Sequence, residues 1–360
     1  MTNNITKTQL DNLKFIKKNN PNISEADILK RIKNIEWSLK LFPQVCEVTI
    51  NYNCNNKCIF CYYDEKTLNK SPQPSLKSIY KTLYLARKNG ANLANIVGGE
   101  PTLRKDLGKI ANFARKIGYP CVKISTNGRL LSDKNLVRSL VEDGINMFNI
   151  SIHSSNPEIH NKMVGIKTAF SDVMKACENI ITAGAELGCD HVINKLNYKL
   201  FPKFIDLTYN KLGINYYNVI YIHYEGMGYA NFKELSVLLD KTVKYIEEGV
   251  NIIKKSNFPA FSRILVNFPP CFFPSYISIL ADWEREPRKK EFLLIDDKTV
   301  DLSHVKDKEI GYTKNCTKCL LYKKCKGFDK SYIENISDNF KPLKKIYPQR
   351  LKTIFDYEKN

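Results

Sequence analysis

The sequence has no uninterrupted apolar stretch of the roughly 18 residues that a membrane-spanning helix needs. Its first residues, MTNNITKTQLDNLKF, are polar and lack the apolar segment of a secretion signal. The 11 cysteines are an odd number, which is a poor basis for a disulfide framework, and a chain of 360 residues can bury a core without one. These absences predict a cytoplasmic protein without membrane contact, in which clustered thiols more often serve metal or redox chemistry than disulfides.

No arginine-rich tract and no known nucleic-acid motif accompanies the net charge of +19. The 56 Lys and Arg residues are spread along the whole chain, which favours a solvated lysine-rich surface over a dedicated nucleic-acid face. Such a surface could still attract RNA, nucleotides or an acidic peptide. Nucleic acid therefore remains an open partner that the sequence does not favour.

Short apolar runs alternate with helical patterns through the middle of the chain. The strand-like runs are VCEVTINYN, NLANIVGGEP, CVKISTNG, MFNISIHSS, CDHVINKLN and YYNVIYIHYEG. Several of the helical patterns between them end in glycine, as helices often do. This alternation indicates βαβ units and a parallel sheet, hence an α/β fold that is an open sheet or a partial (β/α)6 TIM-like barrel. Residues 1–45 before it predict an N-terminal helical segment.

Polar residues gather where the predicted strands end. The carboxyl ends of parallel strands meet on one side of a sheet, so this one-sided placement predicts a single site. Glu225, Tyr221 and Cys271 are candidate proton donors, and no clear catalytic acid or base stands out beside them. The other residues of this set are Cys54, Cys58, Cys61, Gly98, Gly99, Glu100, Ser125, Thr126, Asn127, Ser151, His153, Asn194 and His223, of which Asn194 and His223 rest on strand-end position alone.

Three cysteines lie within eight positions in CNNKCIFC, at Cys54, Cys58 and Cys61. Three thiolates can hold a [4Fe–4S] cluster by three irons and leave the fourth iron open. A structural zinc site prefers four protein ligands, so these three cysteines would leave a zinc ion one ligand short. Exposed cytosolic thiols without a role are a liability. The spacing therefore favours a cluster over zinc and over three idle thiols.

A second cysteine group lies in the last quarter of the chain. Cys271 stands in NFPPCFFP, and Cys316, Cys319 and Cys325 stand in CTKCLLYKKCKG. Four thiolates can satisfy an iron–sulfur cluster or a zinc ion, and the spacing alone does not separate the two. The remaining cysteines lie in apolar patterns and are predicted to be small core residues; they are Cys46, Cys121, Cys177 and Cys189.

The first cysteine group resembles the radical SAM superfamily signature CxxxCxΦC, whose aromatic Φ is Phe60 here. Residues 98–101, GGEP, match a second motif of that family, and the resemblance covers about residues 46–225. It implies an enzyme whose cluster binds S-adenosylmethionine (SAM) at the open iron and cleaves it to a 5′-deoxyadenosyl radical. That radical would take a hydrogen atom from substrate.

The resemblance also implies which residues contact SAM. They are Phe60 beside the adenine, Gly98, Gly99 and Glu100 at the amino group, Thr126 and Asn127 after the third strand, and Ser151 and His153 at ribose or carboxylate. Asn194 is added to the cofactor-binding set from its strand-end position alone. The residues themselves leave simpler alternatives open. The sequence TNG is also typical of a turn, and Phe60 could anchor the loop. His153 could be a core histidine whose hydrogen bonds are made within the protein.

The second cysteine group resembles the SPASM/Twitch extension of radical SAM enzymes, which carries auxiliary clusters. The full SPASM pattern has a further cysteine where this chain has Asp329, which argues against two auxiliary clusters. The resemblance implies one Twitch-like [4Fe–4S] cluster, with three-cysteine ligation and structural zinc as alternatives. Its ligands would be Cys271, Cys316, Cys319 and Cys325. The implied units are a helical segment 1–45, a radical SAM core 46–260 and a cysteine-rich auxiliary domain 261–360.

The resemblance constrains the chemistry more closely than the substrate. The Twitch-like tail and the basic surface favour modification of a peptide or protein by crosslinking, epimerisation or oxidation, with a flavodoxin or ferredoxin as electron donor. The alternatives are rearrangement of a small molecule or nucleotide in cofactor or natural-product biosynthesis, and tRNA modification. A hypothesis from another functional class is a non-enzymatic protein that binds zinc and RNA. Whether SAM is consumed or regenerated does not follow from the sequence.

Overall fold

The computed structural model describes residues 45–345 except 69–72, 215, 256–263, 282, 284–291, 296–297 and 302–309. The helical segment expected for residues 1–45 therefore lies outside the described residues, apart from its last residue. None of the helices in the described ranges combines the length and the apolar character that crossing a bilayer requires.

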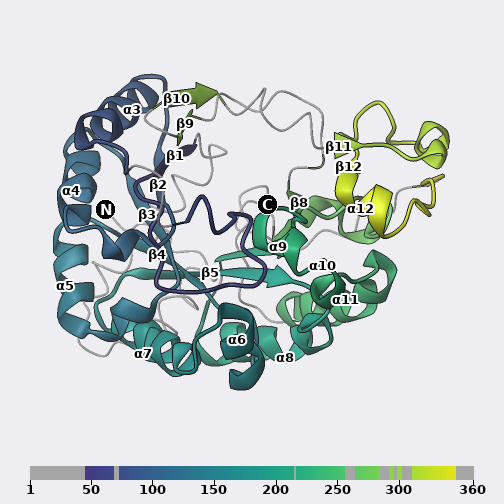
Figure 1. The fold of residues 1–360 in the computed structure, drawn as a ribbon, viewed down its shortest axis with the longest axis horizontal. Helices are drawn as coiled ribbons and strands as arrows, with labels where there is room; N and C mark the ends of the chain where they lie inside the picture. Colours follow the sequence, from purple (N-terminus) through teal and green to yellow (C-terminus); the bar gives the residue numbers. More distant parts are fainter. Residues whose placement is uncertain are drawn as a thin grey trace, which may run out of the picture.

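The described strands form one curved sheet in the order β10-β9-β1-β2-β3-β4-β5-β6-β7-β8. Its six central strands are β1 Val45–Thr49, β2 Leu93–Val97, β3 Cys121–Thr126, β4 Met147–Ser151, β5 Glu186–Ile193 and β6 Tyr216–Tyr221. Each pairs in parallel with the next, so the expected α/β partial barrel is confirmed. Figure 1 shows the sheet curling around an interior with the helices outside it.

Four short strands extend the sheet beyond the six that the sequence predicts. They are β7 Leu265–Val266, β8 Leu280–Ala281, β9 Phe292–Ile295 and β10 Lys298–Asp301. Strands β7 and β8 continue the parallel order after β6, and β9 returns to pair in parallel with β1. Both edges of the sheet therefore come from residues 261–360, and the boundary expected at residue 260 stays a prediction.

Helices follow the strands, as the sequence predicts. They are α3 Leu76–Lys88, α4 Leu107–Lys116, α5 Lys134–Glu142, α6 Pro157–Val164, α7 Ala169–Thr182, α8 Phe201–Ile205 and α11 Leu239–Lys255. Helix α3 illustrates why they form: Ser75 caps its first turn by accepting from the Ser78 amide, and Ile79, Leu83 and Ala86 are buried. Each fully buried aliphatic side chain stabilises the fold by about 2 kcal/mol.

Short helices complete the loops. They are α9 Gly226–Ala230, α10 Phe232–Leu235, α12 Lys330–Asn335, a π-helix at Asp206–Lys211, and 3-10 turns at Pro101–Leu103, Arg129–Ser132, Tyr198–Leu200, Pro274–Ile279 and Lys314–Lys318. The four cysteines expected in the core are all buried there, at Cys46, Cys121, Cys177 and Cys189, and this prediction is confirmed.

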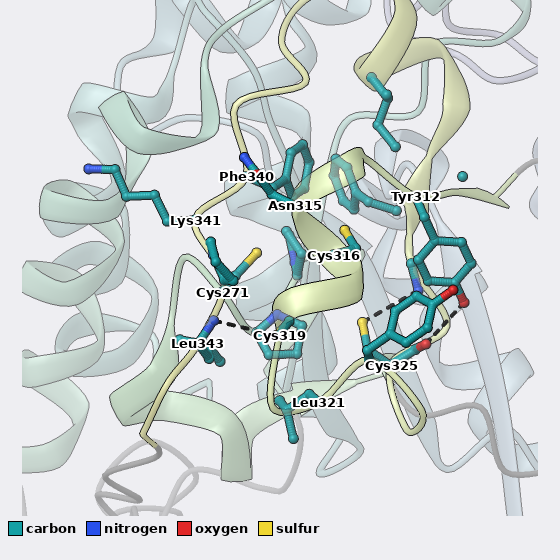
Figure 2. Close-up of a pocket in the computed structure, with 18 residues that line it drawn as sticks. Cys271, Tyr312, Asn315, Cys316, Cys319, Leu321, Cys325, Phe340, Lys341 and Leu343 are labelled. Atoms are coloured by element: carbon teal, nitrogen blue, oxygen red, sulfur yellow. Dashed lines mark hydrogen bonds between the residues drawn. The ribbon is translucent and has the colours of Figure 1, made fainter.

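The cysteine-rich tail packs against the last strands of the barrel. Its antiparallel pair, β11 Ile310–Gly311 and β12 Phe328–Asp329, leads into α12. The Tyr332 hydroxyl accepts from the Leu239 amide at 3.0 Å, and its ring lies 5.8 Å from that of Tyr221. Figure 2 shows the pocket that this tail forms together with the segment around Cys271.

Candidate functional site

The loop that carries the first cysteine group is joined to the end of β2 by main-chain hydrogen bonds. The Gly99 amide donates to the Asn51 carbonyl at 2.9 Å, and the Glu100 amide to the Asn53 carbonyl at 2.7 Å. A Cβ on Gly98 would lie 2.4 Å from Asn51 Oδ1, and one on Gly99 would lie 2.4 Å from the Asn53 oxygen. Both positions therefore require glycine because the two backbones touch.

Two short helices hold the same loop from the other sides. The amides of Lys57 and Ile59 donate to the carbonyls of Val164 and Met163 at the end of α6, at 2.9 and 3.0 Å. On the opposite side, the Gly228 amide of α9 donates to the Cys61 carbonyl at 3.1 Å. The cysteine loop is thus positioned by backbone contacts with three elements that are distant in sequence.

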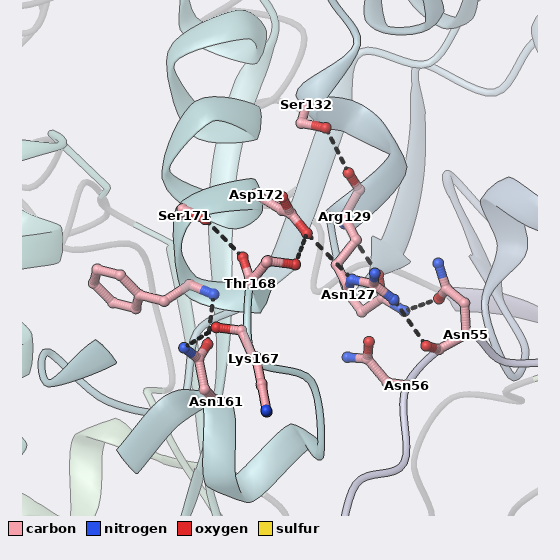
Figure 3. A network of polar contacts seen from close by, with 12 residues as sticks. Asn55, Asn56, Asn127, Arg129, Ser132, Asn161, Lys167, Thr168, Ser171 and Asp172 are labelled. Atoms are coloured by element: carbon pink, nitrogen blue, oxygen red, sulfur yellow. Dashed lines mark hydrogen bonds and ion pairs between the residues drawn. The ribbon is translucent and has the colours of Figure 1, made fainter. Parts of the chain in front are cut away.

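A polar network ties the start of the loop to β3 and α7, as Figure 3 shows. Asn127 Nδ2 donates to Asn55 Oδ1 at 2.7 Å, and Arg129 donates to the Asn55 carbonyl at 2.8 Å. Arg129 is fixed in turn by Asp172, at 3.3 Å. The network orients Asn127, whose amide also lies 3.9 Å from the Cys54 sulfur.

Glu100 anchors the strand ends beneath this loop. Its buried carboxylate accepts four hydrogen bonds, from the Thr102 amide and hydroxyl, the Thr126 hydroxyl and the Asn127 amide, at 2.6 to 3.0 Å. Burial raises the pKa of Glu100, although these donors lower it in part. The carboxylate joins the end of β2 to the end of β3, and direct contact between it and SAM stays a prediction.

A cavity of about 400 Å³ opens below the cysteine loop, inside the barrel. Most of the site residues expected from the sequence line it together. They are Cys54, Cys58, Phe60, Cys61, Gly98, Gly99, Ser125, Thr126, Asn127, Ser151, His153 and His223. The structure thus gathers residues from β1 to β6 around one space, as strand-end chemistry requires.

His153 is both a packed core residue and a cavity residue. It is 3% exposed, its ring lies 4.6 Å from that of Phe60, and its Nδ1 accepts from the Val192 amide at 3.3 Å. Burial lowers the pKa of His153 well below its ordinary value, and His160 and His191 lower it further. The ring is therefore neutral near pH 7, with its proton on Nε2.

Five expected residues do not line this cavity: Glu100, which lies beneath the loop as described above, Cys271, which lines the second cysteine cavity, and Tyr221, Asn194 and Glu225. Tyr221 lies on the outer face of β6, where its hydroxyl donates to the Val237 carbonyl. Strand alternation explains the placement, because Asn218 and Ile220 occupy the inner face. A catalytic role for Tyr221 therefore has no geometric support. Asn194 is fully buried in a turn in which its Oδ1 accepts from the Leu196 amide, and Glu225 precedes α9.

The sequence interpretation missed a polar group at the opposite end of the cavity. It comprises Glu47, Asn95, Lys123, Asp190 and Asn218, and it is called the cavity floor below. These residues interrupt runs that otherwise read as buried strands, for example the Glu in VCEVT and the Lys in CVKIST. A polar residue in the middle of an apolar strand was the signal that could have identified them.

The second cysteine group surrounds a small apolar cavity of about 40 Å³ (Figure 2). Its four members come from two separate segments, and all line it: Cys271, Cys316, Cys319 and Cys325. The Gly327 amide donates to the Cys325 sulfur and the Leu343 amide to the Cys319 sulfur, each at 3.4 Å. Such N–H···S contacts orient thiolate ligands in iron–sulfur sites.

Burial raises the pKa of several thiols at the two cysteine sites. It raises the pKa of Cys61 to about 11 and raises the pKa values of Cys54, Cys58 and Cys271 as well. Thiols in such sites become thiolates when a metal centre binds, because the cation compensates the buried charge. No three His, Cys, Asp or Glu side chains of the described residues converge on one point as single-ion ligands; each cysteine group instead surrounds a cavity.

Asp329 shows how the tail departs from the longer cysteine pattern. Its carboxylate accepts from the Tyr332 amide at 3.0 Å and caps the first turn of α12. It does not line the four-cysteine cavity, although Phe328 beside it does. The residue that replaces a cysteine therefore serves as a helix cap.

Known proteins resemble this chain in sequence. The family model of the Radical SAM superfamily matches residues 48–207. A probable GTP 3′,8-cyclase of Saccharolobus solfataricus is 33% identical over 214 residues, which cover 59% of this chain and 68% of that protein. The Fe-coproporphyrin III synthase of Methanosarcina barkeri is 29% identical over 208 residues, which cover 54% of this chain and 51% of that protein.

Solved structures share the fold over most of the chain. SuiB of Streptococcus suis bound to its precursor peptide SuiA superposes with a TM-score of 0.62 and 15% identity, covering 90% of this chain and 81% of that one. The enzyme anSMEcpe with bound AdoMet gives a TM-score of 0.55 and 16% identity, covering 84% and 93%. At this identity the comparison shows the fold alone.

Proposed function

The chain belongs to the radical SAM superfamily, and from this premise we propose that it holds a [4Fe–4S] cluster at Cys54, Cys58 and Cys61 and modifies a peptide or protein. Membership makes it an enzyme and sets aside the non-enzymatic zinc protein. With SAM bound, the cluster supplies a 5′-deoxyadenosyl radical that takes a hydrogen atom from substrate. The observation that carries the proposal is that the three cysteines open onto the same cavity as the glycine edge of β2.

The chain's own residues would bind SAM and exclude water. Gly98 and Gly99 present bare backbone at the edge where the amino group of SAM is expected. Asn56 Oδ1 is buried at the cavity and has no hydrogen-bond partner among the described residues, so it is available as an acceptor. Phe60 and His153 cover the neighbouring wall with packed rings, which keeps water from a reactive radical.

The four cysteines of the second cavity would hold one auxiliary [4Fe–4S] cluster. They fit the group because all four line one apolar space and because backbone amides already donate to two of the sulfurs. Such a cluster would supply a one-electron acceptor for a reaction whose product is an oxidised or crosslinked side chain. Structural zinc would use the same thiolates, so the iron content decides between the two.

A peptide substrate is favoured by the cavity and by the charge of the chain. About 400 Å³ is near the lower limit for ligand pockets, and SAM would fill much of it. One side chain of a larger substrate fits the remainder better than a second large molecule. The net charge of +19 would attract an acidic peptide. SuiB, which shares the fold, was solved with a precursor peptide.

A small-molecule substrate is the second candidate, because a different observation favours it. Relatives above 30% identity include probable GTP 3′,8-cyclases, and another relative is an Fe-coproporphyrin III synthase. Their names point to nucleotide or porphyrin chemistry. A substrate of this type would act as a whole molecule inside the barrel, without a leader peptide.

The radical chemistry is tested by anaerobic reconstitution. The protein would be loaded with iron and sulfide, reduced with dithionite or flavodoxin, and supplied with SAM, and 5′-deoxyadenosine would be measured by mass spectrometry. We expect 5′-deoxyadenosine and about eight irons per chain, four for each cluster. If the reduced, iron-loaded protein yields none, the proposed function is wrong.

The substrate class is tested in the same assay. Peptides encoded beside the gene would be compared with GTP. We expect a peptide to increase 5′-deoxyadenosine formation and to change in mass. If instead GTP is consumed and no peptide responds, the second candidate is correct.

A further inference from the structure

The cavity floor lies deeper in the barrel than the strand ends that carry the cysteine loop. Glu47 and Lys123 stand in the middle of β1 and β3, several residues before the strand ends that carry the cysteines and Asn127. Asp190 on β5 completes a set of three ionisable groups around the cavity interior. A molecule that sits beneath SAM would therefore meet these three side chains.

The two carboxylates of the floor are held by neutral amides. Glu47 Oε2 accepts from Asn95 Nδ2 at 2.7 Å. Asp190 Oδ1 accepts from Asn149 Nδ2 at 2.6 Å and from Asn218 Nδ2 at 2.8 Å. Both carboxylates are therefore fixed in position before any ligand enters.

Lys123 is the cation among the described residues of the cavity floor. The residue is 4% exposed and lines the cavity. Its Nζ lies 5.4 Å from the centroid of the Tyr216 ring. An ammonium on the wall of a cavity can donate to a ligand that enters it, and a mostly buried ammonium gains from such a partner.

The electrostatic field of the floor keeps this ammonium charged. Burial would lower the pKa of Lys123, but Tyr216, Asp190 and Glu47 act in the opposite direction more strongly, and the pKa is raised. Burial also raises the pKa of Asp190, which Lys123 and nearby donors offset only in part. The shift of Lys123 indicates a negative potential at its ammonium, whereas the shift of Asp190 reflects its burial.

We propose that the cavity floor is the substrate-recognition end of the site, where Lys123 donates to one uncharged acceptor oxygen of the substrate and Glu47 and Asp190 exclude polyphosphates. The proposal rests on the proposed function and defines its substrate class. A peptide carbonyl, a side-chain amide or a hydroxyl supplies the acceptor. The substrate is therefore an unphosphorylated, amide- or hydroxyl-bearing molecule.

The charges of the cavity floor are the reason why polyphosphates would be excluded. The floor has one ammonium against two carboxylates, and Lys123 is the only lysine or arginine among the described residues that line the cavity. A triphosphate would bring several further negative charges into a buried space without cations to pair them. A neutral oxygen acceptor adds no charge and can accept a hydrogen bond from Lys123.

The first test needs no variant. Wild-type holoenzyme is titrated with GTP and with inorganic tripolyphosphate by calorimetry. We expect no saturable binding of either below about 1 mM, in contrast to the micromolar affinities typical of substrates. Micromolar GTP binding with a GTP-derived product overturns this proposal and leaves the radical chemistry intact, whereas absence of 5′-deoxyadenosine overturns the proposed function itself.

The second test removes the excluding charges. In Glu47→Gln with Asp190→Asn, tripolyphosphate affinity is expected to rise about tenfold or more, because the repulsion is lost and Lys123 remains. The matched control, Glu158→Gln with Glu178→Gln, removes two exposed carboxylates and leaves the affinity unchanged. An equal response in both variants overturns the proposal, because it assigns the effect to net charge alone.

The third test addresses Lys123 directly with N-acetylglycinamide, a neutral amide probe, by saturation-transfer NMR. Lys123→Met is expected to abolish the probe signal, Lys123→Arg to restore it in part, and the exposed control Lys134→Met to leave it unchanged. Thermal unfolding reports whether each variant is folded. If folded Lys123→Met binds the probe as wild type does, or if wild type gives no signal, Lys123 is not the anchor.

Discussion

The two cysteine sites of this chain differ in their number of thiols and in the cavity beside them. The first has three cysteines on a loop that backbone contacts hold over a cavity of about 400 Å³. The second has four cysteines around about 40 Å³ of apolar space. Three ligands leave one iron of a cluster free for a reactant, whereas four would saturate it. The comparison indicates that the number of thiols and the size of the adjoining cavity together separate a reaction site from an enclosed centre.

Removing one cysteine from each site gives the largest expected difference. Cys58→Ala should abolish 5′-deoxyadenosine formation, because two thiolates cannot hold the first cluster. Cys319→Ala should keep SAM cleavage and lose the modified product. Iron content and mass spectrometry measure both, with buried Cys177→Ala as the control that changes neither. If Cys319→Ala also stops SAM cleavage, the two sites are not separate in function.

Gly99→Ala tests the backbone support that only the first site has. Its new Cβ would lie 2.4 Å from the Asn53 carbonyl, so the cysteine loop must move. We expect SAM cleavage to fall by about 100-fold, as misplacement of reacting groups by about 1 Å does elsewhere. Gly108→Ala is the matched control, because its Cβ meets the movable end of the Asp143 side chain. Equal rates for the two variants would contradict the steric argument.

Glu100→Gln should lower the free energy of unfolding more than it lowers the rate of SAM cleavage. The amide replaces a carboxylate that accepts four hydrogen bonds and leaves at least one donor facing another donor. We expect the free energy of unfolding to fall by about 2 kcal/mol. Urea denaturation measures it, with exposed Glu142→Gln as control. A large loss of SAM binding in a protein of unchanged stability would instead indicate direct contact between Glu100 and SAM.

Acid should weaken the barrel slightly through its buried histidines. Burial lowers the pKa of His160 to about 4 in the folded chain, below the ordinary 6.5. Between these values the unfolded chain binds the proton and the folded chain does not, so stability decreases as the pH falls. From pH 7 to 5.5 this histidine should cost about 1 kcal/mol. His160→Asn keeps an acceptor for the His153 amide and should flatten the urea-midpoint profile.

Local pattern predicted the central strands and the cysteine groups, because apolar runs and thiol spacing are local signals. The face of a strand was harder to assign: Tyr221 was expected in the site, and alternation places it outside. Lys123 and Asp190 were missed because a polar residue within an apolar run has no defined partner until the strands are aligned. The return of β9 to β1 joins segments about 245 residues apart, which no local pattern specifies.

The pairing of β9 with β1 affects when the sheet can be completed during protein synthesis. The edge of β1 is paired by a strand that leaves the ribosome only after most of the chain has been synthesised. Pairing over such a sequence distance is slow to form and leaves the edge open until late. Iron–sulfur insertion in the cell should accordingly follow completion of translation. Nascent chains stalled before residue 290 should carry Cys54, Cys58 and Cys61 without acquiring iron.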